Sequence, residues 1–171
     1  PDNVGFLVFD AHFDLREEYS GLTLNHATYL RRLFEENERE IKIVHVGSRA
    51  ATREEWNFAK KMGIELITSK EILEGNLAVL NGTLEGVNEL HVSLDLDVLD
   101  PAYAPGVGNP EPGGISSSNL FQMIKILGKC RIRAFDIVEL SPPYDNGATS
   151  AIAAKALALL IAIIHKDHLT I

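Results

Sequence analysis

Short apolar runs rich in β-branched residues alternate along the chain with helix-like segments, and this alternation leaves few folds open. The runs are Val4–Phe9, Ile41–Val46, Leu90–Leu94 and Ile132–Val138, with a weaker one at Ile64–Thr68. Continuous apolar runs of this length predict strands that are buried on both faces. Helical patterns lie at His26–Glu38, Thr52–Met62, Ser69–Leu80, Ser116–Leu127 and Ala148–His165. Strands that alternate with helices predict an α/β fold with a mainly parallel sheet.

Residues that commonly cap helices or form turns mark several boundaries of the predicted elements. Thr52 with Glu55 three residues later resembles a capping box, and Gly63 follows the last turn of that helix. Ser116 offers an N-cap hydroxyl to a later helix. Residues 101–114 contain four of the seven prolines and four glycines, so we expect a long shaped loop there. Long ordered loops usually serve a site.

Length and composition place the 171 residues among ordinary soluble globular proteins, and we expect residues 1–171 to form a single domain. The sequence begins at Pro1 and soon enters an apolar run, so we expect the natural protein to extend further upstream. A single cysteine, Cys130, excludes an internal disulfide and favours a reducing cytoplasm. The apolar stretch Ala151–Ile164 is short for a membrane span and contains Lys155, which favours a buried helix and no membrane partner.

The net charge is −8 at pH 7. Nucleic acid is not an expected partner, because phosphate binding needs clustered lysine and arginine and the sequence has no such cluster. A surplus of acid raises the local concentration of cationic ligands. Many cytoplasmic proteins are acidic for solubility alone, so the charge does not decide the function.

Acidic side chains follow three of the predicted strands. The first strand leads into Asp10, His12 and Asp14, and the fourth into Asp95 and Asp97. The last strand leads into Glu139, which also follows a buried run. The carboxyl ends of parallel strands open on the crevice where α/β proteins bind ligands. Because alternate side chains of an extended chain share a face, we expect the first five residues to converge.

Converging carboxylates at the edge of an apolar core repel one another unless cations neutralise them. Carboxylates with an imidazole and no thiolate favour Mn²⁺ or a similar ion over structural zinc. Two ions suit so many acids and can activate a shared water as a nucleophile. Taken alone, the first run could be a turn with a capping aspartate and a surface histidine. The second could be a solvated strand face, although its interleaved leucines and valine leave little room for that.

The two acidic runs are similar to the manganese-binding signatures of the arginase, agmatinase and formiminoglutamase family. Residues 10–14, DAHFD, match its D-A-H-x-D, and residues 93–101, SLDLDVLDP, match its S-x-D-x-D-x-x-D-P. Residues 101–114 resemble its active-site loop, P-x-x-A-P-G-x-G-x-P-E-x-G-G. Shorter matches lie at 25–27, 46–49, 136–139 and 142–145. The resemblance implies a three-layer α/β/α sandwich of the arginase and deacetylase type, truncated at its N-terminus and here without its first strands.

The resemblance also assigns metal ligands for two manganese ions. It implies that Asp10, Asp14 and Asp95 serve the first ion together with a histidine. It implies that Asp10, His12, Asp95 and Asp97 serve the second. That histidine lies in a Gly-Gly-Asp-His segment in the family, upstream of the first acidic run, and this sequence has no such segment.

Further roles follow from the same resemblance. Glu139 would pair with the substrate guanidinium through two parallel hydrogen bonds, which match that planar cation. Asp14 would pass a proton from the attacking hydroxide to the departing amine. His26 resembles the mobile histidine that shuttles protons, and a structural role at a helix start is the alternative. Val107 and Asn109 stand where many relatives carry threonine, and Asn109 is the candidate substrate contact.

Two remaining residues near these motifs have structural interpretations. Asp100 before Pro101 is expected to shape a turn, since aspartate in that place commonly starts one. His45 lies within a strand pattern and is expected in the core or behind the ligands.

The residues after Asp14 indicate the substrate. Leu15, Arg16 and Tyr19 resemble the agmatinase pattern D-L-R-x-x-Y, whereas arginases usually present small polar groups there. The implied reaction is therefore hydrolysis of agmatine to putrescine and urea, a step of polyamine biosynthesis, on a small cationic guanidino substrate. Arginine, guanidinobutyrate and other guanidino compounds are the alternatives. Family members usually assemble as trimers or hexamers, so a homo-oligomer is expected.

Two interpretations from other classes stay open. A binding or scaffold module could keep the fold without catalysing; the missing histidine supports it and the five other ligands oppose it. A zinc amide hydrolase on the related deacetylase fold predicts one ion and fewer acids, which fits the two acidic runs poorly.

Overall fold

The computed structural model of the chain describes residues 4–36 and 41–165. Its centre is a sheet of five strands in the order β3-β2-β1-β4-β5, and every neighbouring pair is parallel. The strands are β1 Val4–Phe9, β2 Lys42–Ser48, β3 Glu65–Thr68, β4 Glu89–Asp95 and β5 Arg131–Val138. All five predicted strands are present, and the α/β fold with a parallel sheet is confirmed.

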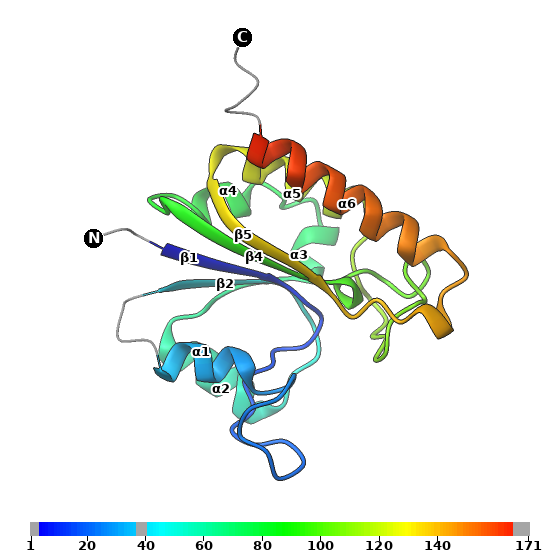
Figure 1. Cartoon of the computed structure of the whole chain (residues 1–171). Helices are drawn as coiled ribbons and strands as arrows, with labels where there is room; N and C mark the ends of the chain where they lie inside the picture. The colour runs from blue at the N-terminus through cyan, green and yellow to red at the C-terminus, as the bar shows by residue number, and fades with distance from the viewer. Residues whose placement is uncertain (1–3, 37–40, 166–171) are drawn as a thin grey trace.

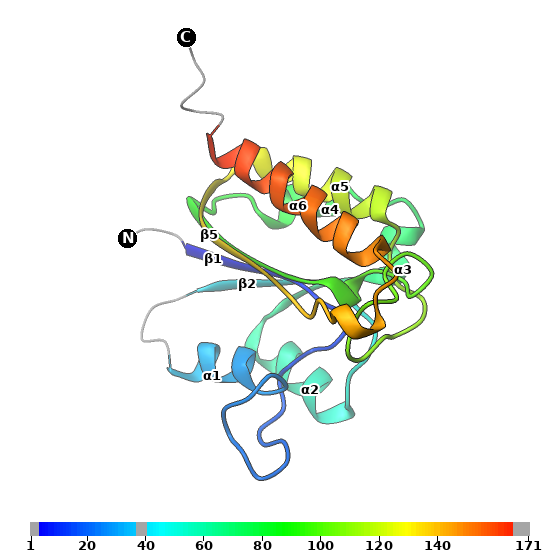
Figure 2. The same cartoon turned by 45° about the vertical axis from the view of Figure 1, so that its right-hand side comes forward.

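Helices cover both faces of the sheet, which gives three layers (Figures 1 and 2). On one face lie α1 Tyr29–Glu36 and α2 Arg53–Met62; on the other lie α3 Ser69–Leu73, α4 Val79–Thr83, α5 Ser117–Ile126 and α6 Ala148–His165. The alternation of side chains along β1 divides the core accordingly. Leu7 and Phe9 belong to the larger cluster under α5 and α6, whereas Val8 belongs to the smaller one under α1 and α2.

The helix boundaries follow the predicted caps. Thr52 accepts a hydrogen bond from the Glu55 amide while the Glu55 side chain returns to Thr52, and Gly63 closes α2 in the left-handed conformation with φ +69°. Ser116 caps α5 in the same reciprocal way. The vague pattern over 69–80 divides into two short helices, because Gly75 takes φ +93° and ends the first of them.

The first predicted helix, His26–Glu38, is shorter than expected. It begins at Tyr29, since Asn25 and Thr28 form a hydrogen-bonded turn before it. Residues 37 and 38 lie outside the described part of the chain. His26 therefore lies on a loop and not in a helical turn.

Two expectations about burial are wrong. β5 is an edge strand of the sheet, and Ile132 is its only buried residue. The helix α6 was expected to be buried, yet within it only Thr149, Ala153, Ala156 and Leu160 are buried. By length and hydropathy alone this helix is able to cross a membrane, and 17% of the stretch is buried. In the fold it packs along α5 and β5 (Figure 1).

Candidate metal centre and substrate pocket

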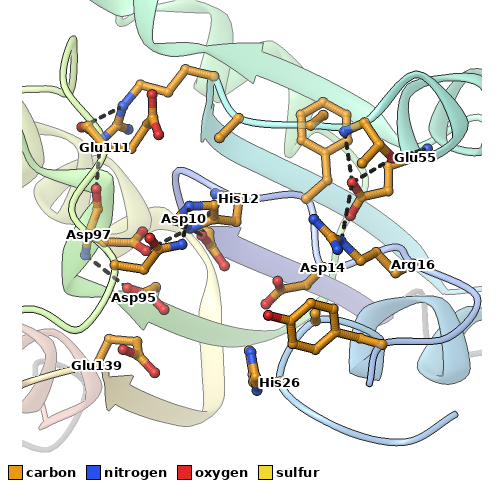
Figure 3. A pocket seen from close by; sticks show the side chains of 18 of the residues that line it. Asp10, His12, Asp14, Arg16, His26, Glu55, Asp95, Asp97, Glu111 and Glu139 are labelled. Carbon is orange, nitrogen blue, oxygen red and sulfur yellow. Dashed lines mark hydrogen bonds and ion pairs between the residues drawn. The ribbon is translucent and has the colours of Figure 1, made fainter. Parts of the chain in front are cut away.

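The site lies at the carboxyl edge of the sheet, where β1, β4 and β5 end. Figure 3 shows the side chains of Asp10, Asp95, Asp97 and Glu139 gathered on one side of a pocket, with Asp14 and His26 across it. The pocket has a volume of about 700 Å³. Neighbouring parallel strands bring these acids together although up to 129 positions separate them along the chain.

The first acidic run leaves β1 with its side chains still alternating. Ala11 and Phe13 are buried, and Asp10, His12 and Asp14 line the pocket, with Phe13 also contributing to its wall. Asp10 itself is only 2% exposed. Asp14 takes a left-handed conformation with φ +52°, which is uncommon outside glycine and concentrates at functional sites. The expected convergence of these three side chains on one pocket is confirmed.

The second acidic run does not stay extended as expected. β4 ends at Asp95, and Leu96–Val98 form a turn of 3₁₀ helix. The Asp95 side chain caps this turn by accepting a hydrogen bond from the Asp97 amide at 2.8 Å. Asp95 and Asp97 still reach the same pocket, because the tight turn carries the second carboxylate back over the end of β1.

Contacts between the two runs join them into one cluster. The Asp97 carboxylate lies 2.8 Å from His12 Nδ1 and accepts a hydrogen bond from the Ala11 amide at 3.0 Å. The Asp10 carboxylate accepts one from the His12 amide at 2.6 Å. Asp10, His12 and Asp97 each offer a ligand atom, and these atoms lie within 4.8 Å of one another. A cation placed among them would have two carboxylates and an imidazole as ligands.

Burial and mutual repulsion keep the acids of this cluster from ionising freely. Burial, followed by the charge of Asp97, raises the pKa of Asp95 to about 9. Burial also raises the pKa of Asp14 to about 7. The pKa of Asp10 rises for the same reason, with Asp95 and Asp97 adding to it. A bound divalent cation would remove this conflict, since it favours the charged form of every acid around it.

Asp97 is the exception in the cluster. Burial favours its neutral form, but hydrogen bonds from His12 and from the Ala11 amide outweigh this, so its pKa is lowered. The hydrogen bond to Asp97 in turn raises the pKa of His12. Within the cluster, Asp97 is therefore the acid whose charged form its surroundings favour.

The other predicted site residues lie around the rim of the same pocket. Glu139 follows β5 in a left-handed conformation with φ +64°, and its Oε2 lies 3.1 Å from where a Cβ on Gly108 would stand. Asn109 donates from Nδ2 toward His12 Nε2 at 3.0 Å. His26 is exposed, and its ring forms a T-shaped pair with the Tyr19 ring, with 5.4 Å between the ring centroids. The structure thus brings every predicted site residue to one pocket.

Asp100 and His45 hold the surrounding backbone as expected. Asp100 accepts hydrogen bonds from the amides of Ala102, Gly113 and Gly114, which closes the loop 101–114 on itself. His45 is fully buried, and burial lowers its pKa to about 4. Because the His12 carbonyl can only accept, Nε2 of His45 donates to it at 2.7 Å.

Two further residues of the pocket wall are absent from the predicted site residues: Arg16, which entered the sequence analysis only through the agmatinase-like pattern, and Glu55. Arg16 lines the wall opposite the acidic cluster, 4.0 Å from the Glu55 carboxylate and 4.9 Å from the Tyr19 ring. Glu55 is 4% exposed and accepts hydrogen bonds from the Leu15 and Thr52 amides. The capping-box pattern identifies Glu55 as a helix cap, but it carries no signal that this cap also forms the pocket wall.

Comparisons with known proteins identify relatives of this chain by sequence and by structure. The sequence matches the arginase family over residues 1–162. A protein of Pyrococcus horikoshii named agmatinase is 36% identical over 157 residues, covering 91% of this chain and 54% of the relative. A guanidinobutyrase of Pseudomonas aeruginosa is 32% identical over 168 residues, covering 94% and 53%.

Among solved structures, agmatine ureohydrolase of Thermoplasma volcanium superposes with a TM-score of 0.88 at 35% identity, covering 98% of this chain and 57% of that one. The chain spans about half the length of the relatives it matches. The match over residues 1–162, the parallel sheet and the acids at its carboxyl edge lead to one conclusion. The chain belongs to the arginase family.

Proposed function

We propose that this chain carries the metal centre of a binuclear manganese hydrolase that cleaves the guanidinium group of agmatine, giving putrescine and urea. The observation that carries the proposal is the gathering of five ligand-type side chains from two strand ends around one pocket, with Glu139 on its rim. These five are Asp10, His12, Asp14, Asp95 and Asp97.

The donor set fits two manganese ions. Oxygen ligands with one imidazole are the set that Mn²⁺ accepts, and the raised pKa values of Asp10, Asp14 and Asp95 indicate a need for neutralising cations. Asp10, Asp14 and Asp95 would hold one ion, together with the histidine that the family resemblance implies upstream of Asp10. Asp10, His12, Asp95 and Asp97 would hold the other. When bound, such a pair supplies Lewis-acid activation of water near neutral pH.

The chain's own residues would position the substrate and move the proton. Glu139 would accept two parallel hydrogen bonds from the guanidinium, and its left-handed backbone turns it toward the pocket beside Gly108. The Asp14 carboxylate would take the proton from the attacking water and give it to the departing amine. Exposed on its loop, His26 would carry a different proton between the pocket and solvent. Asn109, held against His12, would contact the substrate from the loop 101–114.

Agmatine is the favoured substrate because acidic side chains outnumber basic ones in the lining of the pocket. Glu55, Glu111 and Glu139 line it in addition to the metal-site acids, and agmatine carries a cation at each end. The relatives named agmatinase support the same choice.

A guanidino acid is the second candidate. Arg16 presents a guanidinium to the wall of the pocket that lies away from the acidic cluster. A cation in that place suits a substrate with a terminal carboxylate. The similarity to guanidinobutyrase supports this alternative.

Urea release from agmatine, arginine and 4-guanidinobutyrate tests the proposal with the Mn²⁺-loaded full-length protein. We expect agmatine to be hydrolysed, and the Asp95→Asn variant to lose more than about 100-fold in rate, since even indirect partners of metal ligands contribute 10–100-fold. The matched control is Glu85→Gln, an exposed acid away from the pocket, which should keep wild-type activity.

The outcomes separate the candidates. Release from 4-guanidinobutyrate without release from agmatine would assign the protein to the guanidino acid hydrolases. No urea from any of the three compounds by protein with two bound manganese ions would support a non-catalytic module instead.

A further inference from the structure

Arg49 follows β2 and sends its guanidinium into the wall of the pocket, where it is about half buried. Each of its three side-chain nitrogen atoms donates hydrogen bonds, and within the described residues all of these go to neutral oxygen atoms. The acceptors are the carbonyls of Gly47 at 3.2 Å, Asp97 at 2.6 Å, Val98 at 3.1 Å, Leu99 at 3.3 Å and Glu111 at 2.7 Å, and the Ser69 hydroxyl at 3.4 Å.

These acceptors belong to the segments that form the metal site. Three of the carbonyls lie in the turn directly after Asp95, which places Asp97. The Glu111 carbonyl lies in the loop that carries Asn109. Arg49 also contacts the first acidic run, because its backbone amide donates to the Ala11 carbonyl at 3.0 Å. One residue thus links both acidic runs and the loop above them.

The local shape of β2 makes this reach possible. The register between β2 and β3 shifts between Val46 and Ser48, and Gly47 in that bulge has φ +95°. The bulge turns the end of β2 under the turn that follows β4, where the side chain of Val98 lies next to Gly47. Arg49 then extends between the two segments.

The hydrogen bonds also argue against contact with substrate. A guanidinium has no acceptor, and the carbonyls and hydroxyl occupy the N–H groups of Arg49. No donor is left for a substrate carboxylate, in contrast to Arg16 on the opposite wall. Lysine could not replace Arg49, because a single ammonium cannot span acceptors on several segments.

We propose that Arg49 is a positioning residue that fixes the distance between the two acidic runs, and so sets the affinity of the centre for its second metal ion. It acts through main-chain carbonyls and touches neither metal nor substrate. The inference rests on the metal-dependent hydrolysis proposed above, and it adds a residue whose motif, Val46 to Arg49, has no role in that reaction.

The test compares Arg49→Lys and Arg49→Met in the full-length protein with Arg53→Lys and Arg53→Met. Arg53 is exposed on α2, four residues away, and is the matched control. Circular dichroism establishes folding, calorimetric titration gives the affinity for each Mn²⁺, and steady-state kinetics separate kcat from KM. We expect both Arg49 variants to bind the second ion at least about tenfold more weakly and to lose about 10–100-fold in kcat, as for a displaced reacting group. KM should change less than kcat, and the Arg53 variants should match wild type.

Several results would overturn the proposal. A folded Arg49→Met protein with wild-type affinity for both ions would do so, even if its thermal stability were lower. If Arg49→Met does not fold, the Mn²⁺ affinity of Arg49→Lys is the test instead. If neither variant folds, Arg49 is required for folding and the proposal fails. If wild-type protein hydrolyses no guanidino compound, the proposed function fails, while the titrations still test Arg49.

Discussion

Asp95 combines two properties that are costly together, deep burial and acidic neighbours. It is 8% exposed, and its pKa is raised to about 9 from an ordinary value of 3.8. At a pH between those two values, Asp95 keeps its proton in the folded chain and loses it in the unfolded chain. Raising the pH therefore favours the unfolded chain. Stability of the metal-free protein that stems from Asp95 is therefore present at low pH and is lost as the pH rises toward 9.

This pH dependence of stability can be measured on the metal-free protein. In protein freed of metal with a chelator, the free energy of unfolding should fall from pH 7 to pH 9, by at most about 1.4 kcal/mol per pH unit for one proton. The Asp95→Asn variant has no proton to lose and should show a flatter dependence. Urea unfolding of both proteins at pH 7, 8 and 9 measures the difference. Equal slopes would contradict the assigned pKa.

The acids of the candidate metal centre could be predicted to converge because the alternation of side chains along a strand is a local property. Asp10 and Asp14 needed only the position of β1 and the rule that parallel strands end at one edge. Arg49 could not be assigned in the same way. Four of its partners are main-chain carbonyls 48 to 62 positions distant, and any residue type offers a carbonyl.

At the scale of elements, the bulge in β2 sets how the two acidic runs meet. A Cβ on Gly47 would lie 2.3 Å from the Val98 side chain, and the φ of +95° is strained for any other residue. Val98 belongs to the turn that Asp95 caps. A side chain at position 47 that clashed with Val98 would therefore displace the second acidic run.

Gly47→Ala should therefore lower the free energy of unfolding by roughly 2–5 kcal/mol, from backbone strain and overpacking together. Gly63→Ala is the control, because Gly63 has φ +69° with nothing within 4 Å of the added Cβ. It should lower stability by about 1–2 kcal/mol from strain alone. Denaturant unfolding of both variants measures the gap. Equal losses would show that space beside Val98 does not limit this position.

The helix starts could be predicted wherever a capping pattern stands in the sequence, as at Thr52 and Ser116. The 3₁₀ turn after β4 could not, because Leu96 and Val98 continue the apolar strand pattern. The turn forms where Asp95 caps it with its own carboxylate and Arg49 binds its carbonyls, and the second of these contacts is tertiary.

At the scale of the whole molecule, the sheet is covered unevenly. On the α1 and α2 face of β4 and β5, the side chains of His91 and Asp136 are 38% and 42% exposed while they hydrogen bond to each other. On α6, Leu157 and Ile161 are 41% and 44% exposed. An apolar sequence pattern shows that a surface is suited to burial. It does not show whether another element packs on that surface, because that depends on the tertiary fold. The predicted burial of β5 and α6 was wrong for this reason.

The metal centre also belongs to this scale, since it draws on β1, β4 and the loops between distant elements. Anomalous diffraction at the manganese absorption edge, from crystals of the full-length protein grown with Mn²⁺, tests the central claim most directly. We predict two peaks in the pocket, both beside the carboxylates of Asp10 and Asp95, and loss of at least one peak in Asp95→Asn. Crystals with manganese in the medium but no peak within reach of Asp10, His12 or Asp95 would contradict the account.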